Sequence, residues 1–88
     1  MSNAAVTPNQ TPEAQLDLRG TPCPINFVRT KLRLEQMSPG ALLEVWLDAG
    51  EPIEQVPDSL AMEGYLIEEV AERTNYFAIK VRCPLASA

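Results

Sequence analysis

Residues 20–26 read Gly-Thr-Pro-Cys-Pro-Ile-Asn, and this stretch decides how the chain folds. A short alternating run precedes it and a helical pattern follows it. Gly20 suits a sharp turn, because glycine adopts positive φ angles at little cost. Pro22 keeps Thr21 extended. Pro24 suits the first helical position, where its missing N–H would have no partner in any case. The stretch therefore predicts a strand, a tight loop and a helix in succession.

The loop carries a cysteine, Cys23, which these signals place at the N-cap of the helix. Backbone N–H groups at a helix N-terminus lack intrahelical partners, and the helix dipole is positive there. Both effects favour the thiolate, which is the nucleophilic form of cysteine. Serine, threonine, aspartate and asparagine are better caps. The position therefore indicates a reactive thiol, and the alternative is an inert, packed one.

Length and composition narrow the classes of function. The chain has 88 residues, which is enough for one small domain, and it carries a net charge of −5. That charge argues against direct nucleic-acid binding. With two cysteines and no histidine, the chain has no Cys–His or Ser–His pair and a poor zinc ligand set, so we expect no metal and no cofactor. The apolar runs are too short to cross a membrane. Low cysteine usage and no signal peptide predict a cytoplasmic protein.

The run before the loop is expected to be a strand over residues 15–19. Leu16 and Leu18 alternate with Asp17 and Arg19, so one face of this strand should be buried. Asp17 and Arg19 then project to the other face as a solvated pair, or turn back to brace the loop.

The remaining pattern predicts one more helix and three more strands. The expected order after the first helix (residues 27–37) is a strand over 42–47, a helix from Pro52 to Gly64, a strand over 65–71, a turn over 72–75 and a strand over 76–83. Pro57 lies inside the second helix, which predicts a kink or two short helical pieces. Trp46 lies in the second strand, where core packing is the usual role of an aromatic residue.

The order βαβαββ predicts an α+β fold. We expect a two-layer sandwich, in which two helices pack on one face of a four-stranded mixed sheet. Residues 15–83 should form the domain. Residues 1–14, which have no apolar period, should be a disordered tail, and residues 84–88 a short C-terminal tail.

The run Leu16-Asp17-Leu18-Arg19-Gly20, followed after two intervening residues by Cys23-Pro24, resembles the TusA-like (SirA-like) sulfur-carrier family. The later Pro39-Gly40 pair and the order of elements share this resemblance, which covers about residues 15–82. It implies a sulfur carrier that accepts a persulfide sulfur on Cys23. It also implies a cysteine desulfurase or a rhodanese-like protein as the donor. A second protein would take the sulfur onward, toward tRNA thiolation, sulfur oxidation or cofactor sulfuration.

One residue departs from the family motif, Cys-Pro-x-Pro, because Asn26 occupies its fourth position. At the third helical position, Asn26 can turn its amide back toward the cap, or donate to the sulfur. The residues expected to support the sulfur site are Pro24, Asn26, Asp17, Arg19 and Gly20.

Three functions remain open at this point. The first is the sulfur carrier, whose partner enzyme supplies the acid–base groups. The second is a regulatory or protein-binding module of the same fold, which the change to Asn26 favours. The third is a redox protein that cycles between Cys23 and Cys83. In the family's sheet the last strand runs antiparallel to the first two, so we expect these thiols at opposite ends and no disulfide between them.

The first helix carries two apolar stripes, and a two-layer domain can bury only one of them. One stripe consists of Phe27, Leu34 and Met37, on the same side as Thr30, and the resemblance to the family implies that this stripe is the buried one. An exposed row beside Cys23 is then left for docking of the sulfur donor and acceptor, with two arginines along its border. This predicted docking row consists of Ile25, Val28 and Leu32, bordered by Arg29 and Arg33. We expect a monomer that binds these protein partners in turn.

Overall fold

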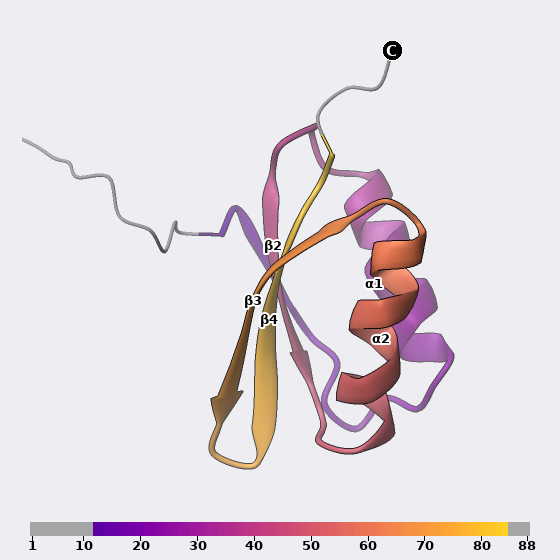
Figure 1. Ribbon diagram of the computed structural model, residues 1–88, viewed down its shortest axis with the longest axis vertical. Helices are drawn as coiled ribbons and strands as arrows, with labels where there is room; N and C mark the ends of the chain where they lie inside the picture. Colours follow the sequence, from indigo (N-terminus) through magenta and orange to yellow (C-terminus); the bar gives the residue numbers. More distant parts are fainter. Residues whose placement is uncertain (1–11, 85–88) are drawn as a thin grey trace, which may run out of the picture.

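The structure, a computed structural model, describes residues 12–84. Within them the chain forms strands and helices in the order βαβαββ (Figure 1). The elements are β1 (Ala14–Asp17), α1 (Ile25–Glu35), β2 (Leu42–Leu47), α2 (Glu51–Met62), β3 (Leu66–Arg73) and β4 (Tyr76–Arg82).

The four strands form one mixed sheet in the order β1-β2-β4-β3. β1 runs parallel to β2, and the β2–β4 and β4–β3 pairs are antiparallel. Both helices lie on the same face of this sheet (Figure 1). The predicted α+β sandwich is therefore confirmed, and β1 and β3 are its edge strands.

The core lies between the sheet and the helix layer. Alternate residues of β2 point into it, and both helices cover it with leucine and valine side chains. Its central members are Leu18, Leu34, Leu43, Val45, Leu47, Val56, Leu60, Ile79 and Val81, all at most 2% exposed. This packing fixes the end of β1 against α1 and α2, and so determines where the following loop lies.

Of the two outcomes predicted for Pro57, the division into two short helical pieces is wrong, since α2 is one helix over Glu51–Met62, and the kink stays a prediction. Val56 and Leu60, on either side of the proline, are fully buried. Tertiary packing of an apolar face outweighs the hydrogen bond that an internal proline removes.

The hairpin turn is shorter than predicted. It takes only Thr74 and Asn75, so β3 extends to Arg73. Asn75 adopts φ 71°, a left-handed conformation that asparagine tolerates better than most residues.

The sheet also begins earlier than predicted. The backbone N–H of Glu13 donates to the Leu42 carbonyl oxygen at 2.8 Å, and Ala14 is the first residue of β1. The predicted tails otherwise fall on residues 1–11 and 85–88, which lie outside the described residues. Between residues 12 and 84, no helix is both long and apolar enough to cross a membrane.

Candidate functional site

The site is built on the loop between β1 and α1. Gly20 has φ +83°, and nothing lies within 4 Å of the position that a Cβ would take there. The glycine is therefore needed for its backbone conformation rather than for space. The N–H of Thr21 donates to the Leu18 carbonyl oxygen at 3.0 Å and closes the turn.

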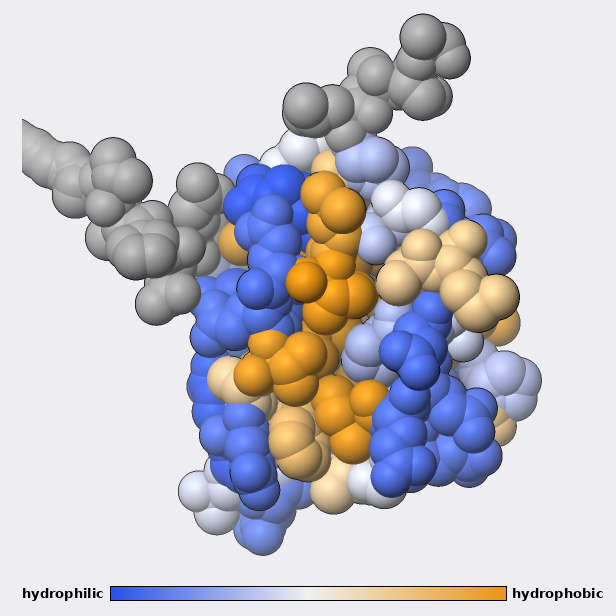
Figure 2. Space-filling model, in the orientation of Figure 1, coloured by the Kyte–Doolittle hydropathy of each residue, from blue (hydrophilic) through white to orange (hydrophobic). Residues whose placement is uncertain are grey.

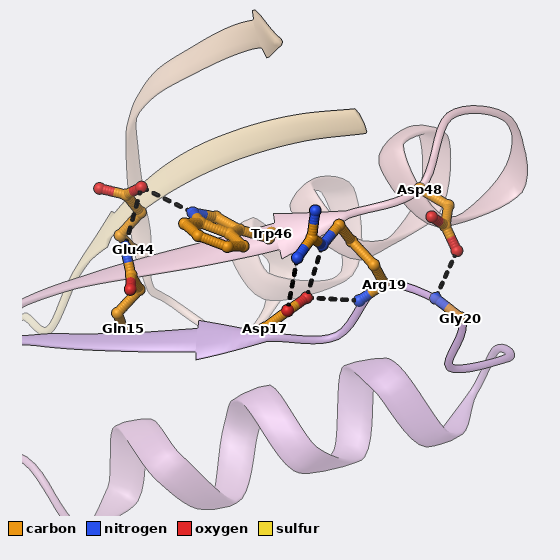
Figure 3. A network of polar contacts seen from close by, with 7 residues as sticks. All are labelled: Gln15, Asp17, Arg19, Gly20, Glu44, Trp46 and Asp48. Carbon is orange, nitrogen blue, oxygen red and sulfur yellow. Dashed lines mark hydrogen bonds and ion pairs between the residues drawn. The ribbon is translucent and has the colours of Figure 1, made fainter. Parts of the chain in front are cut away.

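A second element holds this loop from the side. The N–H of Gly20 donates to Oδ2 of Asp48 at 2.7 Å, and Asp48 directly follows β2 (Figure 3). Sequence analysis did not single out Asp48, because the contact joins residues 28 positions apart. The parallel pairing of β1 with β2 brings the two residues together.

Asp17 and Arg19 form a bidentate ion pair on the face of the sheet opposite the helices (Figure 3). Arg19 donates from Nε to Oδ1 at 2.9 Å and from Nη2 to Oδ2 at 2.8 Å. These side-chain bonds, helped by a bond from the Arg19 backbone N–H, lower the pKa of Asp17 from 3.8 to about 2. The pair thus lies on the outer face of the sheet, which was one of the two predicted alternatives. It also fixes the start of the loop through the Arg19 backbone N–H, which was the other.

Two aromatic rings hold the Arg19 guanidinium. Its Cζ lies 4.8 Å from the ring centroid of Trp46 and 4.7 Å from that of Tyr76. The prediction that Trp46 belongs to the core is wrong, since it lies on the outer face and its Nε1 donates to Glu44 at 2.7 Å. These contacts keep the Arg19 side chain on the outer face of the sheet, so the support that it was expected to give the sulfur site would act through the loop and stays a prediction.

Cys23 lies beside the helix layer. It is half-buried and lines a pocket of about 70 Å³ between α1 and α2, which we name the α1–α2 pocket. The other lining residues are Pro24, Phe27, Gln55, Val56 and Ser59. The space exceeds the ~30 Å³ share of one water molecule in the liquid. A second sulfur atom on Cys23 would therefore find room beside it.

The helix start differs from the prediction by one position. The N-cap is Pro24 and α1 begins at Ile25, so Cys23 precedes the cap and Pro24 is not the first helical residue. First-turn N–H groups are also partly occupied, since the N–H of Asn26 bonds to the Pro22 carbonyl oxygen at 3.0 Å. The picture of Cys23 surrounded by unpaired N–H groups at the cap is therefore wrong.

Asn26 is fully buried in the first turn of α1, at its second residue rather than its third. Its Oδ1 accepts from the N–H of Phe27 at 2.6 Å, and its Nδ2 donates to the Thr21 carbonyl oxygen at 3.4 Å. The amide thus turns back toward the loop, as predicted, although its observed partner there is a backbone carbonyl and not the sulfur. Asn26 ties the helix to the loop on both sides of Cys23.

The predicted docking row on α1 is exposed. Ile25 is 52% exposed, Val28 47% and Leu32 54%, while Leu34 and Thr30 are buried on the opposite side of the helix. This confirms which stripe faces the sheet. The use of the row in docking stays a prediction.

The two arginines beside this row differ in position. Arg29 is exposed, whereas Arg33 lines a separate hollow of about 450 Å³ at the far end of α1. Arg33 lies eight residues beyond the helix start, or roughly 12 Å along the axis. The structure therefore does not bring Arg33 to Cys23.

The second cysteine, Cys83, is buried at the other end of the sheet. Its N–H and carbonyl bond to Ala41 and Gly40, just before β2, and its Sγ donates to the Leu34 carbonyl oxygen at 3.7 Å. Burial, with a smaller contribution from the charge of Glu13, raises the pKa of this thiol. Both cysteines are free, as predicted. The redox alternative loses support, because β1 and β2 are parallel and the two thiols therefore lie at opposite ends of the sheet.

Comparison with known proteins agrees with this geometry. The family model described as "Sulfurtransferase TusA" matches residues 14–83. The chain belongs to the TusA family.

Over residues 12–84 the structure has no cluster of histidine, cysteine or acidic side chains that could hold a metal ion.

TusA-family relatives with curated names cover most of this chain. A "Putative sulfur carrier protein" of Archaeoglobus fulgidus is 40% identical over 68 residues, which is 74% of this chain and 77% of the relative. The "Putative sulfur carrier protein YedF" of Escherichia coli is 31% identical over 64 residues, which is 73% of this chain and 83% of the relative. A SirA-like protein from Desulfitobacterium hafniense, 22% identical, superimposes with a TM-score of 0.70 over 81% of this chain and 97% of its own. That last likeness supports the fold alone.

Proposed function

We propose that this protein is a sulfur carrier that holds a persulfide sulfur on Cys23. The observation that carries the proposal is the place of Cys23 in a braced loop, beside the α1–α2 pocket. In the loading step, the Cys23 thiolate attacks the outer sulfur of a donor persulfide. A new S–S bond forms on Cys23, the donor's S–S bond breaks, and the donor cysteine leaves as a thiolate. Unloading is the same exchange with an acceptor thiolate.

The lining of the α1–α2 pocket supports this role. Phe27 and Val56 provide apolar surface, while Gln55 and Ser59 add polar groups from α2. The pocket is too small for a large substrate, but an S–S bond of about 2.05 Å would place one added sulfur within it. The chain itself carries no histidine to act as a general base. Proton transfers therefore fall to the partner enzymes, a cysteine desulfurase or rhodanese-like donor and a protein acceptor.

Docking would use the exposed row on α1. Ile25, Val28 and Leu32 lie on the helix that starts two residues after Cys23, and Arg29 adds positive charge beside them. An apolar row next to a reactive group is the arrangement that partner-binding surfaces favour. We expect Val28→Asp to weaken binding of the sulfur donor while it leaves the stability of the fold nearly unchanged, since Val28 is about half exposed.

The test is sulfur loading followed by mass spectrometry of the intact protein. The protein is incubated with a cysteine desulfurase and cysteine, in parallel with two matched variants, Cys23→Ser and Cys83→Ser. We expect one added sulfur on the wild type and on Cys83→Ser, and none on Cys23→Ser.

Two other results would point away from a carrier. No adduct from any of a panel of desulfurase and rhodanese-like donors would favour a regulatory module, in which Cys23 has lost its task. A loss of two hydrogens on mild oxidation, in place of an added sulfur, would favour the redox alternative.

A further inference from the structure

The acidic residues of this protein are concentrated on one side. Residues 51–73, which form α2 and β3, hold seven of the 12 acidic residues and one of the seven basic ones. The acidic residues are Glu51, Glu54, Asp58, Glu63, Glu68, Glu69 and Glu72. Three of them are neutralised locally, by Lys31, Lys80 and Arg82. Glu54, Asp58 and Glu72 are exposed and have no ion pair within residues 12–84.

An apolar surface lies beside these three carboxylates. β3 is an edge strand, and its register pairs Val70 with Ile79 and Glu72 with Phe77. Paired residues point to the same face, so Val70 and Glu72 face the helix layer together with Ile67. Val70 is nevertheless 53% exposed. Figure 2 shows the result, a line of apolar side chains between β3 and α2 with hydrophilic residues on both sides. We name Ile67, Val70 and Glu72 the β3 edge strip.

The acidic flank of α2 lies on the side away from Cys23. Successive helical residues turn by about 100°. Gln55 and Ser59, which line the α1–α2 pocket, therefore lie on one flank of α2. Glu54 lies toward the other flank, and Asp58 lies on the solvent-facing side between them. The β3 edge strip and the α1–α2 pocket are thus separate surfaces on the two sides of one helix.

We propose that the β3 edge strip is a second partner-binding surface, which takes an extended basic segment of another protein. The segment would add as a strand to the open edge of β3, with backbone hydrogen bonds as its main attachment. Side chains alternate between the two faces of a strand, so every second residue of the segment would face the helix layer. Along that row, apolar side chains would cover Ile67 and Val70, and a lysine or arginine would meet Glu72 and Glu54.

Charge decides against a second copy of this chain as the occupant. β3 carries three glutamates and one arginine, so pairing two β3 edges would bring like charges together. Edge strands are also commonly protected by charges and by bulges, and β3 has an irregularity between Ile67 and Glu69. Protection of the edge against pairing does not explain why Val70 is half exposed on the helix-facing side of β3. This exposure favours a binding surface.

The probe is an eight-residue synthetic peptide with lysine and valine along one face of the strand and threonine at every second position, on the other face. Two control peptides replace either the lysines by glutamates or the valines by serines. Backbone amide shifts of the full-length protein are followed by NMR during titration. We expect shifts along β3 and the adjoining flank of α2 with the first peptide, and little response to either control. Equal binding of the lysine–serine peptide, or shifts centred on α1, would overturn the proposal.

A matched pair of valines tests the position of the surface. Val70 and Val28 are 53% and 47% exposed, one on β3 and the other on α1. Val70→Lys should weaken binding of the lysine–valine peptide roughly tenfold, because it removes an apolar contact and adds a like charge. Val28→Lys should leave it unchanged. If the two variants bind the peptide equally well, the β3 edge is not the binding surface.

Two further variants guard against loss of folding. Glu54→Lys and Glu72→Lys change exposed side chains and should each reduce peptide binding, whether or not Val70→Lys folds. Unchanged binding in both would contradict the role of charge. Sulfur loading on Cys23 should be normal in Val70→Lys, Glu54→Lys and Glu72→Lys, which change residues outside the docking row on α1. A failure of this proposal is therefore distinguishable from a failure of the sulfur-carrier proposal.

Discussion

Asp48 provides the sharpest test of how the Cys23 loop is held. Its Oδ2 accepts the Gly20 N–H at 2.7 Å, and the bond lies at the surface. A hydrogen bond to a charged acceptor contributes about 1.5–3 kcal/mol when shielded, so at this exposed position about 1 kcal/mol is expected. We therefore expect Asp48→Ala to raise the equilibrium for local opening of the loop about fivefold.

Hydrogen exchange measures that opening directly. The Gly20 amide should exchange about fivefold faster in Asp48→Ala than in the wild type under conditions where exchange follows local opening. Asp48→Asn keeps an oxygen acceptor and should show a smaller effect. Asp58→Ala, at an exposed carboxylate on α2, is the matched control and should leave Gly20 unaffected. If Asp48→Ala leaves exchange at Gly20 unchanged, the carboxylate does not hold the loop.

Three more outcomes follow from the contacts described. Iodoacetamide at neutral pH should modify Cys23 faster than Cys83, because Cys83 is 5% exposed and burial raises its thiol pKa; mass spectrometry of the digested protein gives both rates. The Asp17 carboxyl should titrate near pH 2 by NMR. The ion pair's contribution to the free energy of unfolding is therefore complete above pH 3.8 and is lost as the pH falls through 2. Arg19→Met should return the midpoint toward 3.8. Leu34→Ala, at a site 2% exposed, should lower the free energy of unfolding in urea by about 2–5 kcal/mol.

The fold could be predicted from the sequence because each element has a strong local signal. Alternation in Leu16 and Leu18 indicates which face of β1 is buried, whereas the two apolar stripes of α1 left that choice to the family's spacing. Pro57 suggested a possible division of the second helix that does not occur, because a local propensity was weighed without the packing of the residues beside it. That packing depends on the sheet, which is assembled from distant parts of the chain.

The site was only partly predictable, for a related reason. Cys23, Asn26 and the Asp17–Arg19 pair carry local signals, and the structure places all of them at or beside one loop. Asp48 gives no local signal, since strand pairing alone brings it to Gly20. Trp46 could have been assigned correctly, because it shares its strand phase with Glu44, and a charged residue marks the solvent side of a strand.

The two proposed surfaces differ in charge as well as in position. α1 carries Arg29, Lys31 and Arg33 against a single glutamate, whereas α2 and β3 carry most of the negative charge. Exposed ion pairs add little stability, so this separation is not explained by the needs of the fold. Opposite charges on two faces instead orient approaching partners and raise their rates of association. A carrier must meet a donor and an acceptor at one sulfur, and Cys23 lies beside the pocket where α1 and α2 meet. An acidic partner would thus be steered toward α1 and a basic one toward the side of α2 that faces β3. Both associations should weaken as salt screens the charges.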